Sequence, residues 1–340
     1  MNFSKLKKVY IIAEAGVNHN GSLKKALQMI KLAKKAGADA IKFQSFSADN
    51  LALKQTPKTK YQKKNLGSNI SHHEMLKKLE LQENQFEFLI KECKRYSIDF
   101  LSTPYDIENA KFLLKKKVKA IKVASADLVD VFLHKFLSSK NCSVILSTGM
   151  ANMSEIMQTL KFYKNFKKNK ISLLHCVSNY PCSNSSLNMN GIYVLKKLGY
   201  EVGFSDHTNN DVASILSISM GCKIIEKHFT IDKKLSGPDH KASLNFLELK
   251  IFINNIRIAE KSLGKKIKRC QKEEIDMRNV SRKSLVSTKF IKKGNKISLD
   301  DIKLMRPGRG ISPLKLNDVL NKIAIQNITP DTIINFKMIK

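Results

Sequence analysis

The sequence lacks long apolar runs, and this absence limits where the protein can reside. No run approaches the roughly 18 residues that a membrane-spanning helix needs, so we expect no membrane contact. The apolar stretch after the N-terminal lysines is only about five residues long and contains Glu14, whereas the apolar region of a secretory signal needs roughly 7–15 residues. We therefore predict a cytoplasmic protein whose first apolar stretch is a strand.

Closely spaced cysteines are also missing. None of the six cysteines has C-x-x-C spacing, and they do not form the dense framework of a small secreted domain. The spacing argues against a cysteine-bound zinc cluster. It favours free, buried thiols in a reducing compartment.

Acidic residues and arginine are scarce. The chain has 61 basic and 29 acidic residues, a net charge of +32, and only seven of the basic residues are arginine. Recognition of bases and phosphates favours arginine, and the lysines are scattered along helix faces without interleaved aromatic residues. We predict solvated lysine-rich faces and no nucleic-acid partner, with a non-enzymatic polyanion-binding protein as the alternative. The positive field would help to collect a small anionic substrate.

Short apolar runs alternate with amphipathic stretches along most of the chain. The runs that we predict as strands are residues 9–14, 38–43, 98–103, 118–124, 143–148, 171–178, 200–206 and 222–229. The stretches with helical spacing are residues 22–36, 83–96, 106–116, 127–139, 153–165, 187–198, 209–220 and 244–262. This repeat predicts an α/β protein with a (β/α)8, or TIM, barrel. An open doubly wound sheet is the alternative, which the absence of a G-x-G-x-x-G loop weakens.

Three further segments complete the domain organisation. Residues 44–80 are polar and lysine-rich, and we expect a long loop over the barrel mouth. The barrel pattern ends near residue 265, and a charged linker covers 266–280. Residues 281–340 contain short β-like pieces and turns, which predict a separate small domain, mostly β.

Polar residues stand at the end of every predicted strand. They are Glu14, Asn18, His19, Lys42, Gln44, Ser102, Thr103, Lys122, Ser125, Ser147, Thr148, Ser178, Asn179, Tyr180, Ser205, Asp206, His207, Glu226 and His228. In a TIM barrel the carboxyl ends of the strands build the active site. A barrel core favours Val, Ile and Leu, so packing does not explain polar residues at all of these ends.

His207 and His228 end two neighbouring predicted strands at equivalent heights. Two neutral imidazoles can share one divalent ion while carboxylates or water complete an open coordination sphere. The alternative is two histidines that hydrogen-bond to the backbone. With Glu226 alongside, we favour a metal site.

Lys42 and Lys122 lie inside apolar strands. They could extend to the barrel rim, form a Schiff base, or fix a phosphate or carboxylate. Two lysines accompanied by several hydroxyl groups favour an anion cradle, because imine chemistry calls for a single desolvated lysine. The loop that contains Asp239 and His240, "SGPDHKAS", has the composition of a solvated turn.

Several motifs, in order along nearly the whole chain, resemble one family. "IIAEAGVNHNGSL", "GADAIKFQSF", "STPYD", "ILSTGM", "GFSDHT", "IEKHFT", "SGPDHKAS" and "RPGRGISP" are similar to the bacterial sialic acid (nonulosonate) synthases. The resemblance implies a (β/α)8 barrel followed by a small antifreeze-like (SAF, β-clip) domain. The chain departs from the family's "PSGE" after the fourth strand, where it has Ala126 and Asp127, and some relatives have Asn at the position of Ser178.

The resemblance also implies an activity. Phosphoenolpyruvate would condense with an N-acylamino sugar aldehyde and lose phosphate by C–O cleavage, with a divalent metal as Lewis acid. We expect manganese, with magnesium or cobalt as alternatives. N-acetylmannosamine, giving N-acetylneuraminic acid, is the first expectation for the sugar. A 2,4-diacetamido-trideoxyhexose, giving legionaminic or pseudaminic acid, is the alternative, and a Schiff-base aldolase or lyase is a more distant one.

The resemblance assigns roles to individual residues. The metal ligands would be His207 and His228, and Glu14 and Glu226 would manage protons. The residues that would bind phosphoenolpyruvate are Lys42, Thr103, Lys122, Ser125, Ser147, Ser178 and Ser205. Those that would bind the sugar are Gln44, Asn65, Tyr180, Asp239 and Arg306. Arg306 would come from the partner's SAF domain, which implies a domain-swapped homodimer.

Overall fold

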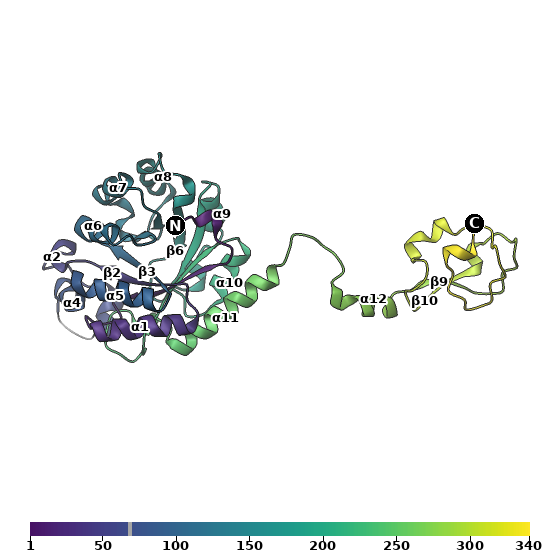
Figure 1. Cartoon of the computed structure of the whole chain (residues 1–340), viewed down its shortest axis with the longest axis horizontal. Helices are drawn as coiled ribbons and strands as arrows, with labels where there is room; N and C mark the ends of the chain where they lie inside the picture. Colours follow the sequence, from purple (N-terminus) through teal and green to yellow (C-terminus); the bar gives the residue numbers. More distant parts are fainter. Residues whose placement is uncertain (67–69) are drawn as a thin grey trace. The chain divides into compact units, whose positions relative to one another are not determined.

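The structure is a computed structural model that describes residues 1–66 and 70–340. Contacts within the chain divide it into two compact units, Met1–Gly264 and Lys265–Lys340. The first unit contains a barrel surrounded by helices, and the second is a small domain with a short sheet (Figure 1).

The barrel consists of eight parallel strands that pair in the order of the sequence. They are β1 (Tyr10–Gly16), β2 (Ala40–Ser45), β3 (Asp99–Pro104), β4 (Ile121–Val123), β5 (Val144–Ser147), β6 (Ile171–Cys176), β7 (Glu201–Asp206) and β8 (Ile224–His228). Pairing of β8 with β1 closes the barrel. The predicted (β/α)8 barrel is therefore confirmed and the open sheet is wrong, because an open sheet would leave its two edge strands unpaired.

Helices connect successive strands and surround the barrel (Figure 1). They are α1 (Leu23–Ala36), α5 (Glu83–Arg95), α6 (Ile107–Lys115), α7 (Val131–Ser138), α8 (Met153–Phe162), α9 (Gly191–Lys196), α10 (Val212–Ser219) and α11 (Phe246–Leu263). In α1, Ser22 accepts a hydrogen bond from the Lys25 amide at the start, and Gly37, with φ of 98°, ends the helix. No helix of residues 1–66 and 70–340 is long and apolar enough to cross a membrane; the cytoplasmic location stays a prediction.

Side chains inside the barrel form two layers, because alternate residues of a strand point to the same face. The lower layer consists of Ile12, Ala40, Leu101, Ala120, Ile145, Leu174, Gly203 and Ile224. Two residues further along, the upper layer consists of Glu14, Lys42, Thr103, Lys122, Ser147, Cys176, Ser205 and Glu226. The residues between them, such as Ile41 and Phe43, belong to the core beneath the helices. Every strand thus changes from apolar to polar over one step of the interior face.

The lower layer is closely packed and closes the base of the pocket. Phe3, in the short turn η1 (Phe3–Lys5), is fully buried against it. Gly203 has no room for a side chain, because a Cβ there would lie 2.5 Å from the Ile224 carbonyl oxygen and 2.6 Å from Leu174 Cδ2. The upper polar layer therefore stands on an apolar floor that excludes water.

The insertion between β2 and α5 corrects one prediction. Instead of a long loop, it contains α2 (Ala48–Leu51), α3 (Lys60–Leu66) and α4 (His72–Leu79). A capping box starts α4, with Ser71 and Glu74 each accepting the other's backbone amide. The apolar residues of the insertion form a small core of their own with Val17: Phe46, Ala48, Met75, Leu76 and Leu79. Although the stretch is rich in lysine, its few apolar residues are enough for the helices to bury one face against this core.

The second unit contains α12 (Ile275–Ser281) and an antiparallel pair, β9 (Ser284–Ser287) and β10 (Ile302–Met305). Its core consists of Leu285, Ile291, Ile297, Ile311, Val319, Ala324, Ile328, Ile334 and Ile339. Short 3-10 turns complete both units: η2 (Ala126–Val129), η3 (Lys168–Lys170), η4 (Asn184–Ser186), η5 (His240–Ala242), η6 (Lys272–Glu274), η7 (Leu299–Asp301), η8 (Pro313–Asp318) and η9 (Phe336–Met338). The second unit is thus a small domain in which short strands and turns enclose an apolar core.

Candidate functional site

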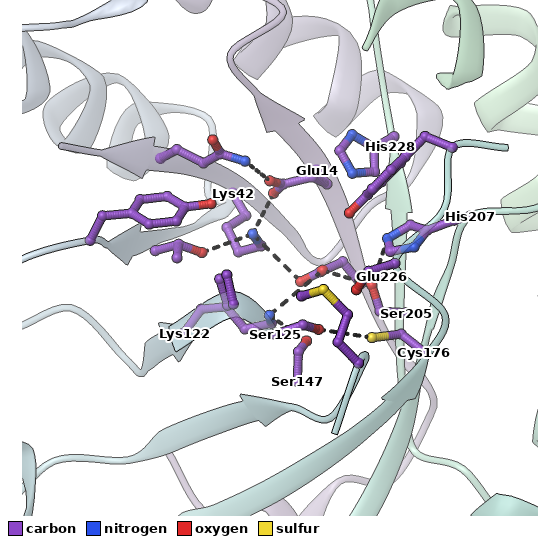
Figure 2. A pocket seen from close by; sticks show the side chains of 18 of the residues that line it. Glu14, Lys42, Lys122, Ser125, Ser147, Cys176, Ser205, His207, Glu226 and His228 are labelled. Atoms are coloured by element: carbon purple, nitrogen blue, oxygen red, sulfur yellow. Dashed lines mark hydrogen bonds and ion pairs between the residues drawn. The ribbon is translucent and has the colours of Figure 1, made fainter. Parts of the chain in front are cut away.

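The upper layer lines a polar pocket of about 340 Å³ at the carboxyl ends of the strands (Figure 2). Most of the residues proposed from the sequence lie together there: Glu14, Lys42, Gln44, Thr103, Lys122, Ser125, Ser147, Ser178, Tyr180, Ser205, His207, Glu226 and His228. Asn65, Asp239 and Arg306 are the proposed residues that do not line it. The fold thus brings residues from all eight strand ends to one cavity.

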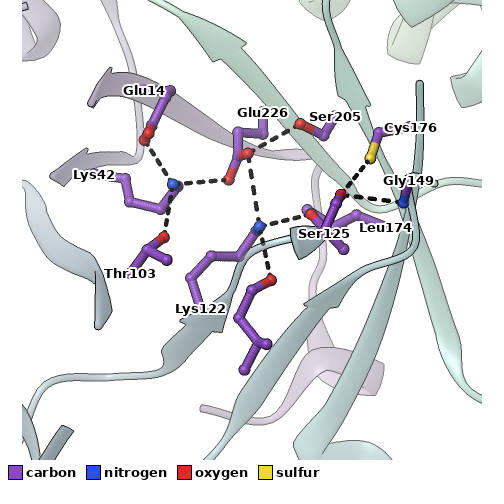
Figure 3. A network of polar contacts seen from close by, with 12 residues as sticks. Glu14, Lys42, Thr103, Lys122, Ser125, Gly149, Leu174, Cys176, Ser205 and Glu226 are labelled. Carbon is purple, nitrogen blue, oxygen red and sulfur yellow. Dashed lines mark hydrogen bonds and ion pairs between the residues drawn. The ribbon is translucent and has the colours of Figure 1, made fainter. Parts of the chain in front are cut away.

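Two buried lysines and two buried glutamates form the centre of the site (Figure 3). Lys42 Nζ lies 2.8 Å from Glu14 Oε2 and donates to Thr103 Oγ1 at 3.0 Å. Lys122 Nζ donates to Ser147 Oγ at 2.6 Å. Glu226 lies between the two ammonium groups, at 3.7 Å from one and 3.9 Å from the other. These separations exceed hydrogen-bond length, so Glu226 neutralises the lysines without occupying their donors.

Burial and charge shift the pKa values of the two carboxyl groups in opposite directions. Burial raises the pKa of Glu14 to about 7, opposed by Lys42 and reinforced by the Glu226 carboxylate. Burial alone would also raise the pKa of Glu226, but Lys122 and Lys42 outweigh it and lower the pKa to about 2. Glu226 is therefore a fixed anion, whereas Glu14 can gain or lose a proton near neutral pH.

The two lysines also differ. Burial by itself would lower the pKa of Lys42, but the carboxylates of Glu14 and Glu226 outweigh it and raise the pKa overall. Burial lowers the pKa of Lys122, which is only partly offset by Glu226. Lys42 is thus held as a cation by direct ion pairing, and Lys122 depends mainly on hydroxyl and carbonyl acceptors.

Beside Lys122, hydroxyl and thiol groups crowd around a glycine. The Gly149 amide donates to Ser125 Oγ at 3.1 Å, and the same oxygen lies 3.1 Å from Cys176 Sγ. A Cβ on Gly149 would lie 2.4 Å from Ser178 Oγ and 2.8 Å from Ser125 Oγ. The glycine is therefore required for this close approach of polar groups.

His207 and His228 lie on one side of the pocket, with Lys42 and Lys122 on the other (Figure 2). Their ring centroids are 5.5 Å apart. Burial lowers the pKa of both, so both rings are neutral at pH 7. His207 Nδ1 donates to the Val177 carbonyl oxygen at 2.7 Å, so Nε2 carries the lone pair, with Ser205 Oγ 3.4 Å away. His228 Nδ1 is buried without a hydrogen-bond partner.

This donor set suits a divalent metal with an open coordination sphere. Two neutral imidazoles, one with its tautomer fixed by a backbone carbonyl, are the ligands that manganese or zinc accepts. In residues 1–66 and 70–340 no group of three or more His, Cys, Asp or Glu side chains is arranged to hold a metal. A metal held by the two imidazoles alone would have its other positions open to water or substrate.

The proposed sugar residues lie at the mouth or beyond it. Tyr180 covers the imidazoles, with its ring centroid 4.2 Å from that of His207. Gln44 Nε2 donates to Glu14 Oε1 at 3.3 Å, so it faces the same cavity. Asp239 lines an adjoining chamber and Asn65 Nδ2 donates to the Pro238 carbonyl oxygen at 2.7 Å. Arg306 belongs to the second unit. The contacts of all five residues with a sugar stay predictions.

Some polar residues at strand ends do not line the pocket. Ser102 and Thr148 point outward and donate to backbone carbonyl groups. Asp206 forms a buried ion pair with Lys227 at 3.1 Å on the helix side of the barrel. The expectation that all polar strand ends converge is wrong for these three and for the loop residues Asn18, His19 and Asn179. The cause is the alternation of the strands, which sends every second residue away from the interior.

Sequence reasoning also missed residues of the pocket: Thr59, Tyr61, Tyr105, Ala124, Ala126, Met150 and Cys176. Cys176 could have been found, because it lies two residues after Leu174 on the interior face of β6. Tyr105 follows β3 by one residue. Tyr61 comes from the insertion, where no strand pattern exists to place it.

Two family models match the chain. The model of the NeuB family matches residues 29–268, and the model of the SAF domain matches residues 282–340. The chain belongs to the NeuB family. The predicted membership of the sialic acid (nonulosonate) synthases is thus confirmed, and so is the SAF domain after the barrel.

Two relatives and one solved structure show what this chain is similar to. The N,N'-diacetyllegionaminic acid synthase of Campylobacter jejuni is 42% identical over 97% of this chain and 99% of its own length. The pseudaminic acid synthase of the same species is 34% identical over 96% of this chain and 95% of its own length. The crystal structure of the N-acetylneuraminic acid synthetase of Leptospira borgpetersenii, in complex with citrate, is 34% identical, with a TM-score of 0.69 over 80% of this chain and 92% of that chain.

Proposed function

We propose that this NeuB-family protein condenses phosphoenolpyruvate with a 2,4-diacetamido-trideoxyhexose, releases phosphate and forms N,N'-diacetyllegionaminic acid. The identity of 42% to a legionaminic acid synthase over almost all of both chains supports this sugar. It favours the alternative over N-acetylmannosamine, the first expectation from the sequence. The observation that carries the chemistry is the buried layer of two lysines, two glutamates and hydroxyl groups.

Phosphoenolpyruvate binds in this proposal at the lysine side of the pocket. Lys42 and Lys122 supply the cationic donors, and each is already oriented by a hydroxyl group. Ser125 and Ser178 add hydroxyl groups to the pocket, and Ser205 donates to Glu226 Oε1 at 2.9 Å between Glu226 and His207. Glu226 lies too far from either ammonium for a hydrogen bond, so an arriving phosphate or carboxylate can accept from both lysines.

His207 and His228 would hold a divalent ion in this proposal, with manganese as our first choice. Bound there, it supplies Lewis-acid chemistry to the sugar aldehyde. The chain's contribution is to present two neutral imidazoles on one side of the pocket, with the ring of Tyr180 over them. Because the histidine side and the lysine side belong to one pocket, the two substrates are held close to each other.

The reaction forms one bond between carbons and breaks one C–O bond. C3 of phosphoenolpyruvate attacks the aldehyde carbon, the aldehyde oxygen gains a proton, and water adds at C2. The resulting tetrahedral centre loses phosphate as the C2–O bond breaks. Glu14 is the group that holds or moves the proton, because its pKa of about 7 lets it do either at neutral pH. Glu226 stays ionised and stabilises the positive charge that develops at C2.

A parallel assay tests the reaction and the sugar. Phosphate release is measured with phosphoenolpyruvate, manganese and, separately, the diacetamido sugar, its pseudaminic isomer and N-acetylmannosamine. We expect the diacetamido sugar of the legionaminic series to give the highest kcat/KM. Phosphoenolpyruvate with a heavy-oxygen label in the bridging position should give labelled phosphate. Label retained in the sugar acid would contradict C–O cleavage.

The Schiff-base alternative has one supporting feature, the lowered pKa of Lys122. Borohydride treatment with pyruvate, followed by mass spectrometry, separates the two mechanisms. The synthase should give no adduct, and a stable adduct on Lys122 would support the aldolase. Exhaustive chelation should abolish activity and manganese should restore it; activity untouched by chelation would count against the metal.

A further inference from the structure

A second chamber adjoins the polar pocket and has a different character. Its volume is about 450 Å³. Six residues line both cavities, so the two lie next to each other: Gln44, Tyr61, Tyr105, Ala126, Tyr180 and His228. A substituent of a ligand held in the polar pocket is therefore within short reach of the chamber.

The wall of the chamber is mostly apolar and comes from the insertion after β2. The apolar residues are Val17, Leu51, Ala52, Leu53, Met75, Leu76 and Leu79. Met75, Leu76 and Leu79 are on α4 and are buried in the insertion's own core. The part of the wall that α4 supplies is therefore a packed surface with a defined shape.

Two polar atoms in this apolar surrounding lack partners. Asp127 and His72 both line the chamber, and both Asp127 Oδ2 and His72 Nδ1 are buried without a hydrogen-bond partner. Burial raises the pKa of Asp127 to about 7, with a contribution from Asp130. Burial lowers the pKa of His72, so its ring is neutral. Buried polar atoms without partners cost free energy, and a ligand that pairs with them recovers it.

An acetamido group matches this combination of wall and polar atoms. It has one N–H donor, one carbonyl acceptor and one methyl group. A neutral imidazole and a carboxyl group that is partly protonated at pH 7 can each donate or accept. Hydroxyl groups offer no methyl group to an apolar wall and would be poorly solvated there.

We propose that the chamber binds the second acetamido group of the sugar and that Asp127 and His72 are the residues that select it. The proposal rests on the proposed function, because it assumes a sugar that carries two acetamido groups. Met75, Leu76 and Leu79 contact the methyl group, and the shared residues around Tyr180 position the rest of the sugar toward the metal side of the pocket. Asp127 thereby receives a role at the position where the chain departs from the family motif.

Steady-state kinetics with a matched pair of sugars test this assignment. The pair is the diacetamido sugar and its analogue with a hydroxyl group in place of the second acetamido group. We expect Asp127→Ala and His72→Gln each to lower the preference for the diacetamido sugar about tenfold, the value of one hydrogen bond of about 1.4 kcal/mol. The loss should appear in the KM of that sugar, whereas the KM of phosphoenolpyruvate stays the same.

His73→Gln is the control, because this neighbour on α4 bonds to Asp49 Oδ1 at 2.9 Å and does not line the chamber. It should keep the wild-type preference. An unchanged preference in both chamber variants, or an equal loss on both sugars, would overturn the assignment. If the wild type instead prefers N-acetylmannosamine, the proposed function fails first, and the two failures are therefore distinguishable.

Discussion

The two interior layers of the barrel differ in chemistry although the same strands build them. The lower layer is apolar, whereas the upper layer, two residues further along each strand, contains two lysines and two glutamates. Lys42 and Leu101 even face each other as partners in the pairing of β2 with β3. Both are almost completely buried. Burial alone therefore does not decide which role a residue has.

The difference separates two roles in this fold: the lower layer stabilises the barrel, and the upper layer provides the reactive groups. Burying the apolar layer contributes to the free energy of folding, at about 25 cal/mol per Å² of apolar surface. Burying these ionisable groups costs free energy, which their mutual pairing and their hydrogen bonds to hydroxyl and carbonyl groups offset. The upper layer is thus kept at some expense in stability, and variants in the two layers should fail in different ways.

Lys42→Met is the variant with the largest expected effect. It removes the cation that pairs with Glu14 and donates to Thr103, so we expect kcat/KM to fall by about 10³-fold. The protein should stay folded by circular dichroism, because Glu14 can take up a proton. Lys31→Met, on the exposed face of α1, is the control and should keep its activity. A loss of less than tenfold for Lys42→Met would remove this lysine from the site.

Co-expression of two inactive variants tests whether the upper layer of one subunit works with the SAF domain of its partner. We predict that Arg306→Ala and Lys42→Met are each inactive alone. If the SAF domain of one subunit serves the barrel of its partner, random heterodimers contain one intact site in two, and about a quarter of wild-type activity returns. No recovery would mean that each barrel uses its own SAF domain, and an active Arg306→Ala variant would mean that Arg306 has no role.

Leu101→Ala tests the lower layer with the pairing partner of Lys42. Leu101 is fully buried in the floor of the barrel, so we expect a loss of roughly 2–5 kcal/mol in the free energy of unfolding, measured in urea. The kcat and KM of the folded fraction should change by less than about threefold. A loss of activity as large as that of Lys42→Met would abolish the distinction between the layers.

The loop after β1 should give the smallest effect, one that depends on pH. Burial lowers the pKa of His19 from 6.5 to about 4. Between these values the unfolded chain binds more protons, so stability is complete above pH 6.5 and declines as the pH falls toward 4. At pH 5.5 the loss is about 1.4 kcal/mol. His19→Gln should flatten the pH dependence of the thermal midpoint, and an unchanged profile would contradict the shift.

The sequence allowed the barrel and most of the pocket to be predicted for one reason. Strand alternation and the positions of strand ends are local properties, and parallel strands bring their carboxyl ends together whatever their order. The same reasoning failed for Ser102, Thr148 and Asp206. The sequence at a strand end does not reveal which of two successive residues points into the barrel. This reasoning also missed Tyr61, because the insertion has helices whose apolar face is too short to recognise from the pattern.

The amino-acid sequence by itself determined the eightfold alternation, the polar strand ends and the membership in a family, because each depends on residues near one another in the chain or on motifs in order. Only the tertiary structure decided which polar residues share a cavity and that the two buried glutamates take opposite pKa shifts. It also decided that a second chamber, where Asp127 Oδ2 and His72 Nδ1 lack hydrogen-bond partners, lies beside the first. These properties arise from distances between groups on different strands and loops, which closure of the barrel fixes.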